Sequence, residues 1–186
     1  MGSAIFELVL LSLPSLVYVR RLRRAGVPRR PALSRVGLQP AGLGDYTRAL
    51  ALLIPVTALG TILLQLIPTS LLNGSSKNIS GVPSTAGGYA AIVILALAEE
   101  MFFRGLVAGL LIKRFGFRKG NALQAMVFLA PHLLLLLVSL RLWPLLPLQL
   151  VAGWTLGWLR ERSQSIGPPW LAHAITNLLP ALLFGL

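Results

Sequence analysis

Residues 89–112 form the long apolar stretch YAAIVILALAEEMFFRGLVAGLLI. Its apolar residues extend far enough for a helix that crosses a membrane, which takes about 17–25 residues. Glu99 and Glu100 nevertheless stand side by side near its middle, although the whole chain has only five acidic residues. A carboxylate inside the hydrocarbon layer is costly unless it is paired, protonated or hydrated. The stretch therefore predicts a membrane span and, within it, a polar site with a function.

The composition of the whole chain agrees with a membrane protein. Of its 186 residues, 55% are hydrophobic and 12% are charged, and the mean hydropathy is +0.77. A soluble domain has about 45–50% apolar and about 25% charged residues. There is no cysteine, which excludes disulfides, a thiol nucleophile and a thiolate metal site. We therefore expect an all-α fold, a polytopic helical bundle in a membrane.

Apolar runs divide the chain into six expected transmembrane helices. The first is short and carries Glu7, and the second is interrupted by Pro55 and Pro68. The six lie at residues 2–19, 49–72, 89–112, 121–140, 142–159 and 169–186.

The net charge of +12 reflects topology rather than nucleic-acid binding, because the basic residues alternate with apolar spans. Residues 20–48, 113–119 and 160–162 hold 14 of the 17 lysines and arginines, whereas the opposite loops hold two. Cytoplasmic loops carry such an excess of positive charge, so both termini are expected outside the cytoplasm. The arginine-rich loop at 20–48 also suits anionic lipid, but topology alone explains it. Residues 73–88, rich in Gly, Ser and Asn, are expected to form an outer loop.

Polar side chains gather at membrane depth on three of the expected helices. Glu100 and Arg104 are four residues apart and share a helical face, so they are expected to pair. Glu99 is then left without a local partner. A buried polar network that only locks helices together is the alternative, but ionisable groups inside a membrane mark functional sites by default. The six candidate residues are Glu99, Glu100, Arg104, His132, His173 and Asn177.

Two kinds of chemistry fit these residue types. A glutamate and a histidine that converge on one water make a general base, and a second histidine with an asparagine supplies donors to a developing oxyanion. That set suits hydrolysis of an amide. Alternatively, two histidines and one or two glutamates hold a divalent metal that activates the water. The residues alone leave both mechanisms open.

Three spaced motifs resemble those of the CPBP family, the Abi or CAAX-protease-like intramembrane endopeptidases. They are EExxxR at residues 99–104, FxxxH at 128–132 and HxxxN at 173–177. They occur in family order on three separate helices, with one motif-free helix between the second and the third. The resemblance implies a CPBP-type catalytic core of four helices over residues 89–186. Residues 1–88 form two N-terminal helices and the basic cytoplasmic loop, without a motif.

The resemblance also implies a role for each candidate residue. Glu99 with His132 would polarise the attacking water, while Glu100 would pair with Arg104 and support the site. It favours a glutamate-dependent mechanism with no cofactor, and a divalent metal such as zinc is the alternative.

The third motif completes the implied machinery. His173 and Asn177 would stabilise the oxyanion of the tetrahedral intermediate. If the enzyme used a metal, Glu99, His132 and His173 would be its ligands.

Other residues in the spans are expected only to pack. Phe102 and Phe103 face lipid or neighbouring helices. Small-residue pairs spaced four apart let helices approach closely, and they occur at residues 105–109 and 153–157.

The expected substrate is a peptide or a transmembrane tail, because so short a chain has little soluble mass with which to recognise a folded protein. Within that class we expect cleavage of a C-terminal membrane anchor. Membrane lipids are the other expected partner, and nucleic acid is not one. The expected setting is a prokaryotic plasma membrane, with the active-site cavity open to the cytoplasm.

The residues leave two other classes of function open. One is a non-catalytic scaffold or bacteriocin-immunity-type protein that binds a peptide in the same polar cavity. The other is a proton-coupled transporter, which the lack of duplicated halves disfavours.

Overall fold

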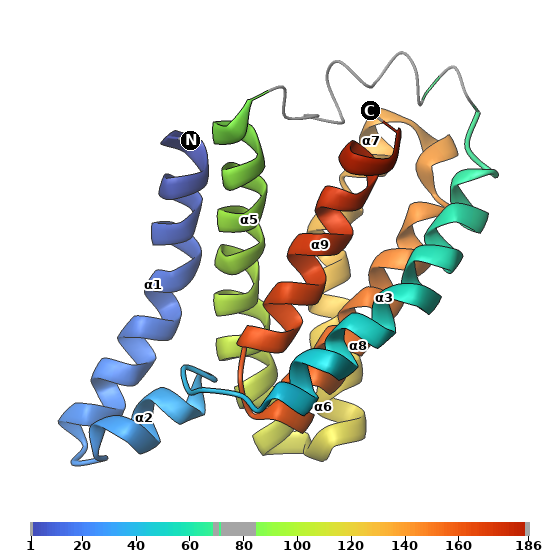
Figure 1. Ribbon diagram of the computed structural model, residues 1–186. Helices are drawn as coiled ribbons and strands as arrows, with labels where there is room; N and C mark the ends of the chain where they lie inside the picture. The colour runs from blue at the N-terminus through green and yellow to red at the C-terminus, as the bar shows by residue number, and fades with distance from the viewer. Residues whose placement is uncertain (1, 69–70, 72–84, 185–186) are drawn as a thin grey trace.

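The fold is known from a computed structural model, which describes residues 2–68, 71 and 85–184. These residues are largely helical and contain no strand, which confirms the all-α prediction. Figure 1 shows the arrangement of the helices. The segments are α1 (Gly2–Arg24), α2 (Arg29–Arg35), α3 (Leu43–Leu64), α5 (Ala86–Glu100), the π-helix η1 (Met101–Ala108), α6 (Gly109–His132), α7 (Leu135–Val138), the 3₁₀-helix η2 (Leu140–Leu142), α8 (Leu145–Ser163) and α9 (Gly167–Phe184).

Three helical stretches of the described chain are long and apolar enough to cross a membrane. They are Gly2–Arg24, Leu43–Leu64 and Ala86–Val138. The first is longer than the sequence predicts, because its helix continues through the arginines that follow residue 19. Helices α8 and α9 are not among the three, so the count of six spans stays a prediction.

The third stretch turns back on itself at Gly116. This residue has φ 74° and ψ 169°, a conformation that suits glycine because it lacks a Cβ. A Cβ on Gly120 would lie 2.5 Å from Cα of Ile112, whereas eight residues of a continuous helix span about 12 Å. The chain therefore forms a tight helical hairpin here, within the basic loop that the sequence places between the third and fourth spans.

The helix that carries the two adjacent glutamates is not regular. It changes from α to π directly after Glu100, over Met101–Ala108, whereas the sequence predicts one continuous α-helix. Short π-helical segments occur frequently at functional sites. The hydroxyl of Ser15, fully buried on α1, donates a 2.6 Å hydrogen bond to the carbonyl oxygen of Met101. Helix α1 thus contacts the start of the π-helix.

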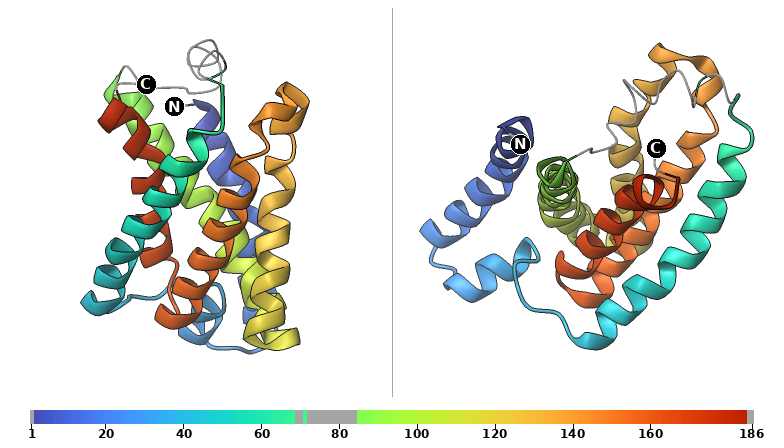
Figure 2. Two further views of the ribbon diagram at one scale, coloured as in Figure 1. Left: turned by 90° about the vertical axis from the view of Figure 1, so that its right-hand side faces the viewer. Right: turned by 45° about the horizontal axis from the view of Figure 1, so that its top comes forward.

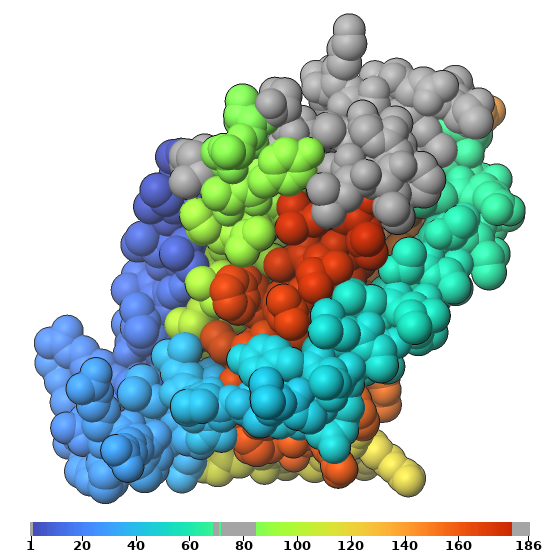
Figure 3. Space-filling view, viewed as in Figure 1, coloured from blue at the N-terminus to red at the C-terminus, as the bar shows by residue number. Residues whose placement is uncertain are grey.

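Helix α9 packs against three other helices of the bundle. It contacts α3, α5 and α8, and Figure 3 shows it on one face of the molecule between α5 and α3. On the other side of the bundle α6 lies beside α8 (Figure 2). His173 of α9 therefore meets both glutamates of α5 inside the bundle.

Two buried amide side chains clamp α6 to α8. Asn121 Nδ2 donates to the carbonyl oxygen of Trp154 at 3.0 Å, and Gln124 Nε2 donates to that of Gly153 at 2.6 Å. A Cβ on Gly157 would overlap both amides, and one on Gly153 would lie 3.2 Å from Ala125. The small-residue pair at 153–157 is therefore a packing contact, as predicted.

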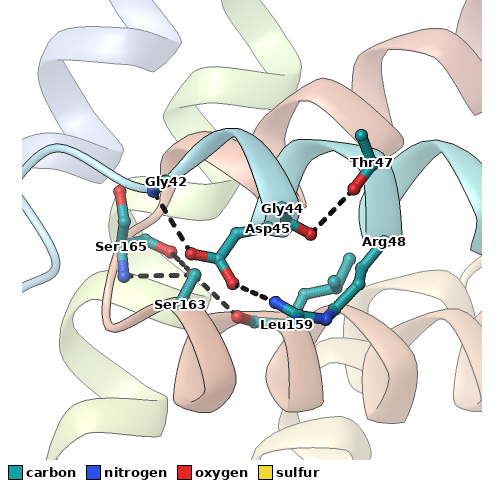
Figure 4. A network of polar contacts seen from close by, with 8 residues as sticks. All are labelled: Gly42, Gly44, Asp45, Thr47, Arg48, Leu159, Ser163 and Ser165. Carbon is teal, nitrogen blue, oxygen red and sulfur yellow. Dashed lines mark hydrogen bonds and ion pairs between the residues drawn. The ribbon is translucent and has the colours of Figure 1, made fainter.

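The start of α3 lies beside the turn between α8 and α9, and short polar contacts order both (Figure 4). The backbone N–H of Gly42 donates to Asp45 Oδ2 at 3.3 Å, and Asp45 Oδ1 pairs with Arg48 at 2.8 Å. The hydroxyl of Ser163 donates to the carbonyl oxygen of Ser165 at 2.9 Å. These contacts fix the turn from which α9 starts toward the site.

The start of α1 and the end of α9 lie at one end of the bundle, and α2 lies at the other (Figure 1). The hairpin turn within α6 and the turn before α9 are at the α2 end. All three predicted basic loops therefore lie together there, as an alternating topology requires. Most of the outer loop expected at 73–88 lies outside the described residues.

Candidate active site

Glu100 connects two helices and the π-helix at the centre of the bundle. Its Oε1 lies 2.9 Å from Nη1 of Arg104 and 2.8 Å from Nδ1 of His173. Glu100 ends α5, Arg104 lies in η1 and His173 lies in α9. Both charged side chains are completely buried, and His173 is 8% exposed. Glu100 and Arg104 thus form the ion pair that the sequence predicts, and His173 joins it.

This arrangement sets the tautomer of His173. As the partner of the Arg104 cation, the Glu100 carboxylate can only accept a hydrogen bond, so Nδ1 of His173 carries the proton. Nε2 of the neutral ring then holds a lone pair. It faces Oε2 of Glu99 at 3.8 Å, which is too far for a direct hydrogen bond.

The two adjacent glutamates meet different surroundings. The side chain of Glu100 is 0% exposed, whereas that of Glu99 is 21% exposed. The carboxylate of Glu99 has no hydrogen bond within the described part of the chain, and its one ion-pair contact there is with His173. Glu99 is therefore the carboxylate that remains accessible to a water or a substrate.

The guanidinium of Arg104 stacks on the ring of Phe128, 4.1 Å from its centroid. The face of an aromatic ring attracts a cation in this position. Among the described residues, Nε, Nη1 and Nη2 of Arg104 and Oε2 of Glu100 lack a partner with hydrogen-bond geometry, although Nη1 lies close to Oε1. Ordered waters commonly satisfy such buried groups, so we expect water in this part of the bundle.

The ring of Phe128 contacts four residues of the site. It packs edge-on against Phe103 at 5.1 Å and against His173 at 6.0 Å, and it lies 4.9 Å from the ring of His132. With Arg104 on its face, it holds both histidines and the cation in place. The sequence identifies Phe128 only as the first letter of a motif. Its spacing of four residues from His132 is the signal by which the sequence could identify Phe128 as a residue of the site. Phe103 packs, as expected.

His132 lies beside the site, and its action with Glu99 on one water stays a prediction. Its Nδ1 is 2.9 Å from the carbonyl oxygen of Phe128, which can only accept, so Nδ1 carries the proton. In the described residues no hydrogen bond or ion pair joins His132 to Glu99. The structure instead brings Glu99 toward His173.

Asn177 lies one turn beyond His173 on α9, and its side chain is exposed. Both residues line a cavity between α3, α6, α8 and α9, together with Thr176, Phe128 and apolar side chains such as Leu52. It leaves about 60 Å³ for the centres of water molecules, which is room for a few waters. Helix α3 thus forms one wall of the cavity, although it carries no motif.

The alternative metal site needs three ligands in one place. Nowhere among the described side chains do three His, Cys, Asp or Glu residues gather in a way that suits a metal ion. The ligand set Glu99, His132 and His173 is therefore not assembled, and we derive no step through a metal.

Comparison with known proteins gives one match. A family model described as "Type II CAAX prenyl endopeptidase Rce1-like" matches residues 82–179, which is more than half of the chain. Neither curated proteins nor solved structures give a match. The matched residues include all three motifs and every candidate residue of the site.

Proposed function

Because the chain belongs to the Rce1-like family of type II CAAX prenyl endopeptidases, we propose that it is an intramembrane protease that uses Glu99 to activate water. Its substrate is a membrane-associated peptide or a C-terminal tail. One observation carries the proposal. Of two adjacent glutamates, Glu100 is buried in an ion pair, whereas Glu99 is accessible and lies 3.8 Å from a histidine nitrogen.

The proposed reaction begins with a water held between Glu99 and His173. A single water can reach both Oε2 and Nε2, because they are 3.8 Å apart and each hydrogen bond needs about 2.8 Å. Glu99 takes the proton while the water oxygen attacks the carbonyl carbon of the peptide bond. The same carboxyl then returns the proton to the leaving nitrogen as the carbon–nitrogen bond breaks.

The other candidate residues support these two steps. Glu100 accepts from Nδ1 of His173 and so aims Nε2 at the water, as a carboxylate does for a histidine in other hydrolytic sites. The amide of Asn177 supplies hydrogen bonds to the oxyanion. His173 thus takes the place beside Glu99 that the resemblance gives to His132. His132, with its free Nε2, accepts a hydrogen bond from the substrate backbone.

The cavity favours an extended substrate, and we propose that this substrate arrives from the basic end of the bundle. It is narrow and mostly apolar, so it suits a tail or an unfolded peptide better than a folded protein. A C-terminal membrane anchor is our proposed substrate. The basic residues at the α2 end are consistent with six spans, a cytoplasmic location of that end and a cavity open to the same side. A prokaryotic plasma membrane is proposed from the resemblance.

Cleavage of a panel of tail peptides by the purified protein in detergent tests the proposal. Replacement of a general base costs about 10²–10⁴-fold in rate, so Glu99→Gln should lose at least about 100-fold. Glu7→Gln is the matched control, because Glu7 lies on α1 outside the site. Wild-type rates in Glu99→Gln would contradict the proposal. Failure of the wild type on a broad panel would support a binding protein instead.

The same assay addresses the metal. We propose that no metal takes part, so cleavage should continue after treatment with a chelator. Loss of wild-type activity with a chelator, restored by zinc, would instead support the ligand set of Glu99, His132 and His173.

A further inference from the structure

A second cavity lies at the basic end of the bundle, between α2, α6 and α8. We propose that this basic cavity binds the phosphate group of an anionic phospholipid. It is lined by Arg35, Lys113 and Arg160, together with Glu161 and the polar side chain of Ser34. None of these residues lines the cavity beside His173, so the basic cavity is distinct from the proposed active site.

Arg160 is the buried cation of the basic cavity. It is 5% exposed, and its Nη2 reaches the carbonyl oxygens of Ser34 and Arg35 only at 3.4 and 3.5 Å. Its Nε is buried without a hydrogen-bond partner among the described residues. Burial lowers the pKa of the Arg160 guanidinium, although the neighbouring Glu161 raises it in part. A buried charge is costly unless it is paired, and an anion in the cavity would supply the pair.

Two exposed cations flank the opening from different helices. Arg35 ends α2, and Lys113 lies on the first leg of α6. With Arg160 they outnumber the carboxylate of Glu161 by three to one. The guanidinium groups suit the oxygen atoms of a phosphate in particular.

The size and the walls of the basic cavity also suit a headgroup. It leaves about 430 Å³ for the centres of water molecules, far more than the narrow cavity beside His173. Helix α2 closes one side, because a Cβ on Gly109 would lie 2.9 Å from the carbonyl oxygen of Arg35. The second close approach is at Gly37, where a Cβ would lie 2.6 Å from Nε of Arg160. The backbone thus packs tightly around the guanidinium and leaves its other side open.

The location favours a lipid as the source of the phosphate. The cavity opens at the end of the bundle where 14 of the 17 basic residues gather, which is the level of lipid headgroups for a protein with this topology. Basic pockets between membrane helices on the cytoplasmic side commonly bind anionic headgroups. Free phosphate shares this chemistry and is the other source to be tested.

Thermal unfolding of the full chain in non-ionic detergent, followed by tryptophan fluorescence, tests the proposal. Short-chain phosphatidylglycerol is titrated at about 150 mM salt, which screens exposed charges beyond about 8 Å. Parallel arms use short-chain phosphatidylcholine and inorganic phosphate. The double variant Arg35→Gln/Lys113→Gln removes the two flanking cations. Arg30→Gln/Lys119→Gln removes the same charges from the same two helices, outside the cavity.

Phosphatidylglycerol should raise the Tm of the wild type up to a plateau as its concentration increases, and phosphatidylcholine should raise the Tm much less. Each cation is worth about fivefold in affinity, so the cavity variant, which lacks two, should bind about 25-fold more weakly. The control should stay within about threefold of the wild type. Equal weakening in both double variants, or no saturable shift with either phosphate source, would overturn the proposal. If only inorganic phosphate raises the Tm, and this rise is lost in the cavity variant, the site binds free phosphate and the lipid proposal is wrong.

Discussion

At the scale of residues, the site depends on one carboxylate that is held and one that is accessible. Glu100 is enclosed between Arg104 and His173, while its neighbour Glu99 is left to face Nε2 of His173. Hydrogen bonding to Glu100 fixes the proton on Nδ1, so the buried ion pair sets the direction in which the histidine acts. Phe128 completes the arrangement, because its ring supports the cation on its face.

Removal of the Arg104 charge should therefore destabilise the protein as well as inactivate it. Arg104→Gln leaves Glu100 buried without its cation, and breaking a buried pair in this way costs about 3–5 kcal/mol. Arg104→Lys keeps the charge but loses the planar stack on Phe128, so its Tm should lie between those of the wild type and Arg104→Gln. Tm in detergent measures this order. A Tm of Arg104→Gln equal to that of the wild type would show that the pair does not hold the site.

At the scale of elements, close helix contacts position the motifs. Ser15 of α1 binds the start of the π-helix. The amides of Asn121 and Gln124, which precede Phe128 on α6 by about two turns and one turn, bind α6 to α8. The glycines of α8 make room for those amides. Elements outside the motifs thus determine where the motif residues lie.

Gly157→Ala should destabilise the bundle because its Cβ would overlap the side chains of Asn121 and Gln124. Overpacking of this kind costs about 1–3 kcal/mol. Gly60→Ala is the matched control, since a Cβ there meets the side chain of Leu148 at an ordinary 3.5 Å. In the interior of α3 it should be neutral or stabilising by up to about 1 kcal/mol. Equal Tm values for the two variants would contradict the clamp.

Much of this arrangement could be predicted from local sequence. Apolar length predicts the helices, and spacing of four residues predicts the ion pair between Glu100 and Arg104. The basic cluster around Gly116 predicts the turn of the hairpin. Each of these features depends on residues that are close together in the chain.

The remaining features depend on contacts between distant residues. The π-helix after Glu100 lies against Ser15 of α1, which is 86 positions away from Met101. The approach of His173 to both glutamates depends on how α9 packs on α5. Neither periodicity nor motif spacing carries that information, so the sequence predicts a regular helix and does not place His173 beside the glutamates.

At the scale of the whole molecule, charge and architecture agree. The start of α1 and the end of α9 lie opposite α2 and the basic turns (Figure 1), and the motif-free helices α1 and α3 contact α5 and α9 respectively. The protein is an integral membrane protein by its family and its three apolar helical stretches. The basic end is the one that we place in the cytoplasm.

Labelling of single cysteines tests this orientation, and the absence of native cysteine makes the background low. Lys119→Cys at the hairpin turn should react with an impermeant maleimide only from the cytoplasmic side. Arg141→Cys in η2 should react only from the outer side. Both residues are exposed, so reactivity reports the side rather than burial. Reaction of both positions from one side would contradict the topology.

Peptide cleavage and Tm, measured for Glu99→Gln and Glu100→Gln in the same detergent, separate the roles of the two carboxylates. The different surroundings of the two carboxylates predict that Glu99→Gln keeps the wild-type Tm and loses cleavage by at least about 100-fold. Glu100→Gln should lose both, because Arg104 is then buried without its anion. Full cleavage by Glu99→Gln, or an unchanged Tm in Glu100→Gln, would contradict the division between an accessible base and a buried support.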